Sequence, residues 1–148
     1  VMAIGRVHFW PGDDTIHRVP HGFRWPTSKS TVVIWNYWFF GEAIRGIGPY
    51  KFINSNDDLS TKDCKSRRSR AVRVLNSLIK TAVDADMIQN QRQVGVENSA
   101  VIFDFAYREL MRKLYPNQPD KRGGDLVLCA VYERLRKVDR ADVDRLAN

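Results

Sequence analysis

The clearest pattern of hydrophobic and polar positions lies between Lys62 and Ala85, where apolar residues recur at intervals of three, four and seven. That spacing predicts one long helix with a single buried side. Ser60, with Asp63 three residues later, resembles a capping box and marks the expected start. The predicted buried stripe consists of Ala71, Val74, Leu75, Leu78 and Ala82, with Ile79 beside it.

A shorter helix is predicted over Ser28 to Phe40, with Ser28 or Ser30 as its N-cap and Gly41 as its end. The β-branched run Val32-Val33-Ile34 also fits a short strand, but the segment does not alternate. Helical spacing is followed by Val32, Trp35, Trp38 and Phe39. We therefore expect a buried helix of about three turns.

The C-terminal half predicts two further helices and a short terminal one. The first runs from about Asn98 to Tyr115 and ends before Pro116. Its expected core positions are Phe103, Tyr107, Leu110, Met111 and Leu114. The next helix is capped by Asp125, and residues 141–148 are expected to form a separate terminal helix. Core positions of the helix after Asp125 are Leu128, Val131, Tyr132, Leu135 and Val138.

These elements predict an all-α fold, a helical bundle of four to five helices with an irregular N-terminal arm. Pro and Gly recur up to Pro26, so we expect no regular element there. The arm is expected to pack through Trp10, Phe23 and Trp25. A chain of 148 residues supports one compact domain. We divide it into the arm (1–27), a core with the tryptophan-rich and basic helices (28–88) and a C-terminal helical extension (97–148) packing on that core.

Charge is distributed unevenly along the chain. Residues 1–61 carry a net charge of +1, residues 62–80 carry +6 and residues 81–148 carry 0. A local excess of Lys and Arg is an electrostatic footprint for a polyanion, with nucleic acid first and anionic lipid second. The alternative reading is a solvated charged helix face, which is common on soluble proteins.

The basic helix supplies the candidate binding residues. At 100° per residue, the side opposite the buried stripe carries Lys62, Ser66, Ser69, Arg70, Arg73, Ser77 and Lys80. We expect Ser66, Ser69 and free backbone N–H groups to hold phosphates, and Arg70 and Arg73 to face base edges in the major groove. Six phosphate contacts would give a slope of log affinity against log salt of roughly −5. The complete candidate DNA-binding set is Lys51, Lys62, Lys65, Ser66, Arg67, Arg68, Ser69, Arg70, Arg73, Ser77 and Lys80.

No catalytic chemistry emerges from the sequence. Phosphate-cradling glycine motifs are absent, and the three histidines lie in the arm without a zinc-binding pattern. Cys64, beside Lys62 and Lys65, fits either a reactive thiol or, more readily, a bystander. We expect no enzyme, no metal and no cofactor. Two cysteines cannot form a disulfide framework, and no apolar run is long enough to cross a bilayer.

The tryptophans allow two interpretations. Trp35 and Trp38, with the aromatic residues around them, fit a platform on which exposed bases stack. They also fit core anchors, because a small domain has few other large groups to bury. We favour the core.

The chain resembles a known DNA-binding family. The segment from Thr31-Val32 through Ile34-Trp35-Asn36-Tyr37-Trp38 to Gly41 is followed by Pro49-Tyr50-Lys51 and by the Arg-rich Arg67–Val72. This order resembles the C-terminal DNA-binding domain of the fungal transcriptional activator of glycolytic enzymes. The fuller string from Pro20 to Leu59 also resembles uncharacterised oomycete-type proteins related to that domain. The resemblance implies sequence-specific duplex binding and a Myb-like or helix-turn-helix-like core.

Together these observations predict the DNA-binding domain of a transcription regulator or mobile-element protein, located in the nucleus and inserting its basic helix in the major groove. The expected partner is double-stranded DNA, with the C-terminal helices as the site of homo-oligomer contact and no membrane involvement. The alternative is a helical protein-protein interaction module whose basic helix binds an acidic partner.

Overall fold

The computed structural model describes residues 7–9, 16–20, 22–118 and 126–147. Within these ranges the chain forms an all-α bundle, as predicted, with a small hairpin at its N-terminal side. The α-helices are α1 (Thr31–Phe40), α2 (Ser55–Asp58), α3 (Lys62–Asp84), α4 (Ser99–Leu114) and α5 (Leu128–Ala147). Single 3-10 turns are η1 (Ala43–Arg45), η2 (Tyr50–Phe52) and η3 (Gln91–Gln93).

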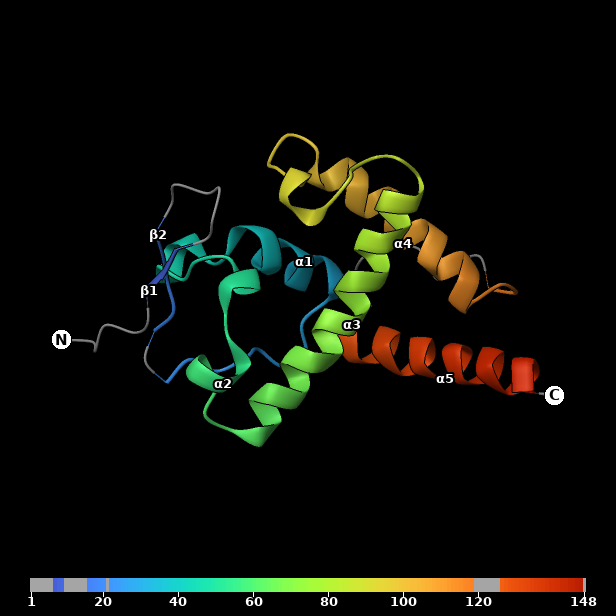
Figure 1. Ribbon diagram of the computed structural model, residues 1–148, viewed down its shortest axis with the longest axis horizontal. Coiled ribbons are helices and arrows are strands. Elements are labelled where there is room, and N and C mark those ends of the chain that lie inside the picture. The colour runs from blue at the N-terminus through green and yellow to red at the C-terminus, as the bar shows by residue number, and fades with distance from the viewer. Residues whose placement is uncertain (1–6, 10–15, 21, 119–125, 148) are drawn as a thin grey trace.

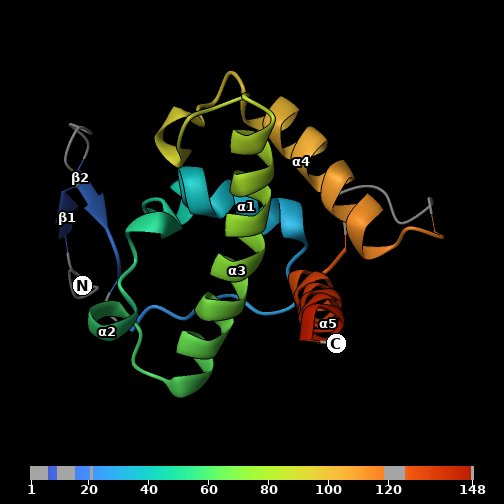
Figure 2. The ribbon, with the colours of Figure 1, turned by 45° about the vertical axis from the view of Figure 1, so that its right-hand side comes forward.

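The long helix α3 runs across the front of the molecule, with α1 behind it (Figures 1 and 2). Helices α4 and α5 both pack against α3. In Figure 1, α5 projects from the body toward the C-terminus, on the side opposite the hairpin. The segments that join the long helices are longer than the three or four residues of a compact helix-turn-helix turn. Because α4 and α5 pack against α3, one side of that helix is buried, while its other side lies at the surface.

The hydrophobic pattern of α3 predicted its packing correctly. Its predicted stripe, including Val74, Leu75 and Leu78, has no exposed surface. That stripe meets the inner faces of α1, α4 and α5 in one continuous core. At about 25 cal/mol per Å² of apolar surface removed from water, this shared core holds the C-terminal helices to the tryptophan-rich segment.

Helix α1 is held by the burial of its aromatic side chains. Trp35 is fully buried and its Nε1 donates to Ser99 Oγ at 2.9 Å, while Trp38 is 5% exposed and donates to Gln91 Oε1 at 3.1 Å. Both are core residues, so neither offers its ring face to a base. The helix ends at Gly41, where φ is 72° and an added Cβ would lie 2.3 Å from the Ile47 carbonyl oxygen. Only glycine fits that turn.

Three predicted details were wrong. The N-terminal arm is not wholly irregular, because β1 (Val7–Phe9) and β2 (Ile16–Arg18) pair as antiparallel strands. Residues 141–147 continue α5 and form no separate helix. Helix α3 is capped by Thr61, whose hydroxyl accepts from the Cys64 N–H at 3.1 Å, and not by Ser60. Trp10 and Asp125 lie outside the described residues.

Candidate nucleic-acid interface

The surface side of α3 forms one exposed stripe along the whole helix, called here the outer stripe. It consists of Lys62, Lys65, Ser69, Arg73, Asn76 and Lys80. At 100° per residue these six positions point in nearly the same direction, away from the buried stripe. All six are exposed, so neither α4 nor α5 covers them.

The lysines of the outer stripe differ in whether a carboxylate pairs with them. Lys62 and Lys65 have no carboxylate within ion-pair distance among the described residues. Lys80, farther along, pairs with Asp84 at 2.9 Å in an exposed contact. Asp63, in the first turn, is the single acidic residue of 62–80. A phosphate chain would therefore meet its strongest attraction at the start of α3.

Arg73 is not the free, groove-facing arginine that the sequence predicted. Its Nη2 lies 2.9 Å from Asp139 Oδ2 on α5, and its guanidinium lies 6.0 Å from the centroid of the Tyr132 ring. Lys113 on α4 approaches the other Asp139 oxygen at 3.5 Å. The Arg73 side chain keeps 44% of its surface exposed, so the pair is solvated and weak. A phosphate at this position would compete with Asp139.

Two of the predicted contacts have structural roles. Arg68 is half-buried and its Nε donates to the Ile53 carbonyl oxygen at 3.1 Å. Burial lowers the pKa of its guanidinium. Lys51 belongs to η2 and its ammonium lies 5.8 Å and 5.3 Å from the ring centroids of Phe39 and Phe52. These contacts hold Arg68 against Ile53 and Lys51 beside two phenylalanine rings, so neither cation belongs to the outer stripe.

Arg67 and Arg70 lie on the flank of α3 that faces the start of α5. Arg67 Nη2 contacts Cys64 Sγ at 3.5 Å, and Arg70 lies 5.8 Å from the centroid of the Tyr132 ring. Ser66 and Ser77 are half-buried at the edge of the outer stripe. The eleven candidates thus fall into three groups: the outer stripe and its edge, this flank, and the structural pair Arg68 and Lys51.

Cys64 is closed to reagents. This residue of the first turn of α3 is only 2% exposed. Burial raises the pKa of its thiol, but hydrogen bonds from Thr61 and the Trp25 backbone, with Arg67 nearby, outweigh it and lower the pKa. A buried thiol without access does not act as a nucleophile toward a substrate. Sequence reasoning had left this alternative open.

Within the described ranges, no three His, Cys, Asp or Glu side chains gather as metal ligands would. No described helix is both long and apolar enough to span a bilayer. Comparisons with models of protein families, with curated proteins and with solved structures each found no match. The outer stripe and the flank of α3 are therefore interpreted from their own chemistry.

Sequence reasoning missed one feature of this region. Residues 29–31 and 126–128 pair across the fold, with Thr31 N–H donating to the Leu126 carbonyl at 2.9 Å and Leu128 N–H to the Lys29 carbonyl at 3.0 Å. The pairing brings Lys29 beside the α3 flank that carries Arg67 and Arg70. The two segments are almost a hundred residues apart, and no local pattern in either predicts it.

Proposed function

We propose that this chain is a double-stranded DNA-binding domain of a transcription regulator or mobile-element protein, and that the outer stripe of α3 faces the duplex. The observation that supports it is the exposed N-terminal half of that stripe, where Lys62 and Lys65 form no ion pair with a described residue. A single exposed α-helix has the dimensions that the major groove of B-DNA admits.

The proposed DNA contacts are fewer than the six phosphate contacts that the sequence predicted. Lys62 and Lys65 contact phosphates from the first turns, and Arg70 adds a third charge from the neighbouring flank of α3. Ser69 and Asn76 are the exposed polar side chains of the stripe between its cations, so they face base edges. Arg73 joins only where a phosphate displaces Asp139. Three phosphate contacts give a slope of log affinity against log salt of roughly −3.

Fluorescence anisotropy with a labelled random duplex tests the proposal. The full chain is expected to bind, and Lys62→Ala with Lys65→Ala is expected to weaken binding without changing thermal stability, because both side chains are exposed. The matched control is Arg136→Ala with Arg140→Ala on α5, which removes the same charge elsewhere. Equal loss in both double variants, or no binding by the unmodified chain, contradicts the proposal.

Self-association and nuclear location are further parts of the proposal. Near the projecting end of α5, Val143 and Leu146 are 64% and 88% exposed, which supports a homo-oligomer contact there. Sedimentation of the chain and of its Leu146→Glu variant tests it.

The basic run 65–70 fits a nuclear import signal, which a fluorescent fusion tests.

A further inference from the structure

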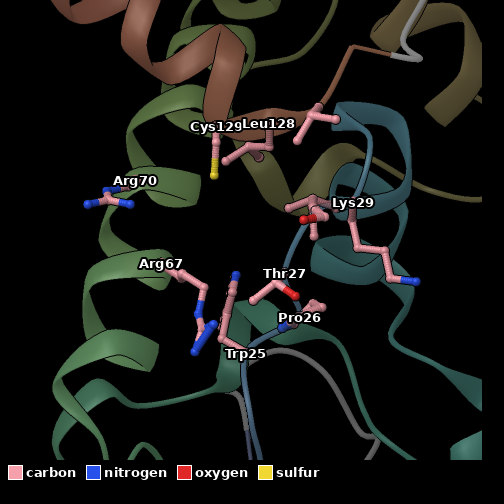
Figure 3. A pocket seen from close by; sticks show the side chains of 11 residues that line it. Trp25, Pro26, Thr27, Lys29, Arg67, Arg70, Leu128 and Cys129 are labelled. Atoms are coloured by element: carbon pink, nitrogen blue, oxygen red, sulfur yellow. The ribbon is translucent and has the colours of Figure 1, made fainter.

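A cleft of about 150 Å³ opens on the flank of α3 that faces the start of α5 (Figure 3). Three segments form its walls: residues 25–29, the α3 side chains of Arg67 and Arg70, and residues 127–129. The antiparallel bridge between Ser30 and Val127 fixes the first segment against the third. The cleft is thus a built feature of the fold, distinct from the outer stripe.

The floor of the cleft is apolar. It is lined by Trp25, Pro26, Ile34, Val127 and Leu128. An apolar cavity of about 150 Å³ is large enough to take up one benzene ring. The floor therefore suits a single aromatic or branched aliphatic group.

The rim of the cleft is cationic. Its charged residues are Lys29, Arg67 and Arg70, and no described carboxylate lines it. In Figure 3 the Lys29 and Arg70 side chains extend outward in different directions, while Arg67 turns toward Trp25. The three charges surround the opening and do not converge on one point. This arrangement suits several separate anions around an apolar group better than it suits one phosphate.

Arg67 also carries an unused donor. Its Nε is buried and has no hydrogen-bond partner. A buried donor without a partner costs free energy, so the wall of the cleft holds an unsatisfied polar group. Beside it, Ser28 holds a positive φ of 54°, a conformation that non-glycine residues adopt mainly where the surroundings require it.

We propose that this cleft docks an acidic peptide. One apolar side chain of the peptide enters between Trp25 and Leu128, and carboxylates on either side of it meet Lys29 and Arg70. The proposal does not depend on the DNA contacts of Lys62 and Lys65, which point away from the cleft on the outer stripe. Arg70 is the one residue that both proposals use. It assigns the chain a protein partner whose recognition element is an acidic segment with a single aromatic or aliphatic anchor.

The test uses the full chain and a short fluorescein-labelled peptide in which one Phe is flanked by Asp and Glu. Saturable binding is expected by anisotropy at physiological salt. Peptides with Phe replaced by Ser, or with the acids replaced by Lys, are expected not to bind. Lys29→Glu with Arg70→Glu is expected to weaken peptide binding about tenfold. The matched variant Lys62→Glu with Lys65→Glu changes the net charge equally and is expected to stay within about twofold.

Cys129 gives a second readout that needs no substitution. It is exposed and lines the cleft, whereas Cys64 is buried, so alkylation by N-ethylmaleimide reports on the cleft. Peptide at saturation is expected to slow that alkylation. No saturable binding, an equal loss in the two double variants, or an unprotected Cys129 overturns the proposal. Protection of Cys129 by duplex DNA but not by the peptide also overturns it, because the cleft would then belong to nucleic acid.

Discussion

Arg73 on α3 and Asp139 on α5 form an ion pair of 2.9 Å across the two helices. Lys113 on α4 joins the same carboxylate at 3.5 Å, so one acidic side chain connects three helices. The pair lies where α5 meets the proposed DNA-binding face of α3. It also lowers the positive charge in the middle of the outer stripe.

Replacing Asp139 with Asn is therefore expected to strengthen DNA binding. The substitution frees Arg73 for a phosphate, which makes the salt slope steeper by about 1. The cost in unfolding free energy is below about 1 kcal/mol, because the pair is solvent-exposed. Anisotropy titrations at several salt concentrations measure the effect. An unchanged slope would place Arg73 outside the DNA contact.

Arg68 is expected to contribute to stability and not to DNA binding. Arg68→Ala removes the donor to the Ile53 carbonyl and leaves a buried acceptor unpaired, so the unfolding free energy falls by about 1–3 kcal/mol. Arg68→Lys keeps the charge but lacks the planar guanidinium, so it is expected to lose only part of this unfolding free energy. Urea denaturation measures the loss. If Arg68→Ala is as stable as the unmodified chain and its salt slope is shallower, Arg68 contacts DNA after all.

Ser99→Ala is expected to destabilise the fold through Trp35. The fully buried indole N–H donates to Ser99 Oγ at 2.9 Å and would lose that partner. The expected loss of unfolding free energy is about 1–3 kcal/mol. Ser69→Ala, the same substitution at an exposed position of α3, is the control and should stay within about 0.5 kcal/mol. Equal effects at both positions would show that this hydrogen bond does not stabilise the fold.

High pH is expected to destabilise the protein through Tyr50. Its hydroxyl donates to Glu42, and burial together with that bond raises the pKa of Tyr50 above its ordinary value of 10.0. Above pH 10 the unfolded chain loses this proton while the folded chain keeps it, so the unfolding free energy falls as pH rises. The slope is about 0.7 kcal/mol per pH unit at pH 10 and approaches about 1.4 kcal/mol per pH unit, the value for one proton, near pH 11.

Urea denaturation between pH 9 and 11 measures that slope. Tyr50→Phe starts from a lower stability because Glu42 loses one of its donors and keeps Arg45, but its unfolding free energy should depend less on pH. Burial, with Glu42 nearby, also raises the pKa of Tyr37, so part of the slope should remain. An unchanged slope in Tyr50→Phe would rule out this residue as the source.

Periodicity in the sequence was enough to predict the long helices, but not the short helix α2. The buried positions of α3 and α4 follow from local spacing, and α1 begins after Ser30, one of its two predicted N-caps, although the Ser30 side chain makes no capping hydrogen bond. The hairpin was missed because Pro and Gly around it indicate turns without indicating that the strands pair. The partners of Arg68 and Arg73 were missed because helical phase shows which direction a side chain takes, not what a distant segment places there.

For the candidate site too, the sequence pattern predicted local positions but not contacts with distant segments. Helical phase placed Lys62 and Ser69 on an exposed face, where the structure has them, but it did not place Lys65 there, although the structure does. Asp139, which pairs with Arg73, and Lys29, which completes the cleft rim, come from segments far away in sequence. Only the tertiary contacts separate the cations that stay open from those that are already paired.

The salt dependence of duplex binding tests the central claim most directly. For the unmodified chain, log affinity plotted against log salt is expected to fall with a slope of roughly −3, and Lys62→Ala with Lys65→Ala should bring it to roughly −1. A slope near zero for the unmodified chain, or the same slope in the double variant, would contradict a DNA contact through the start of α3.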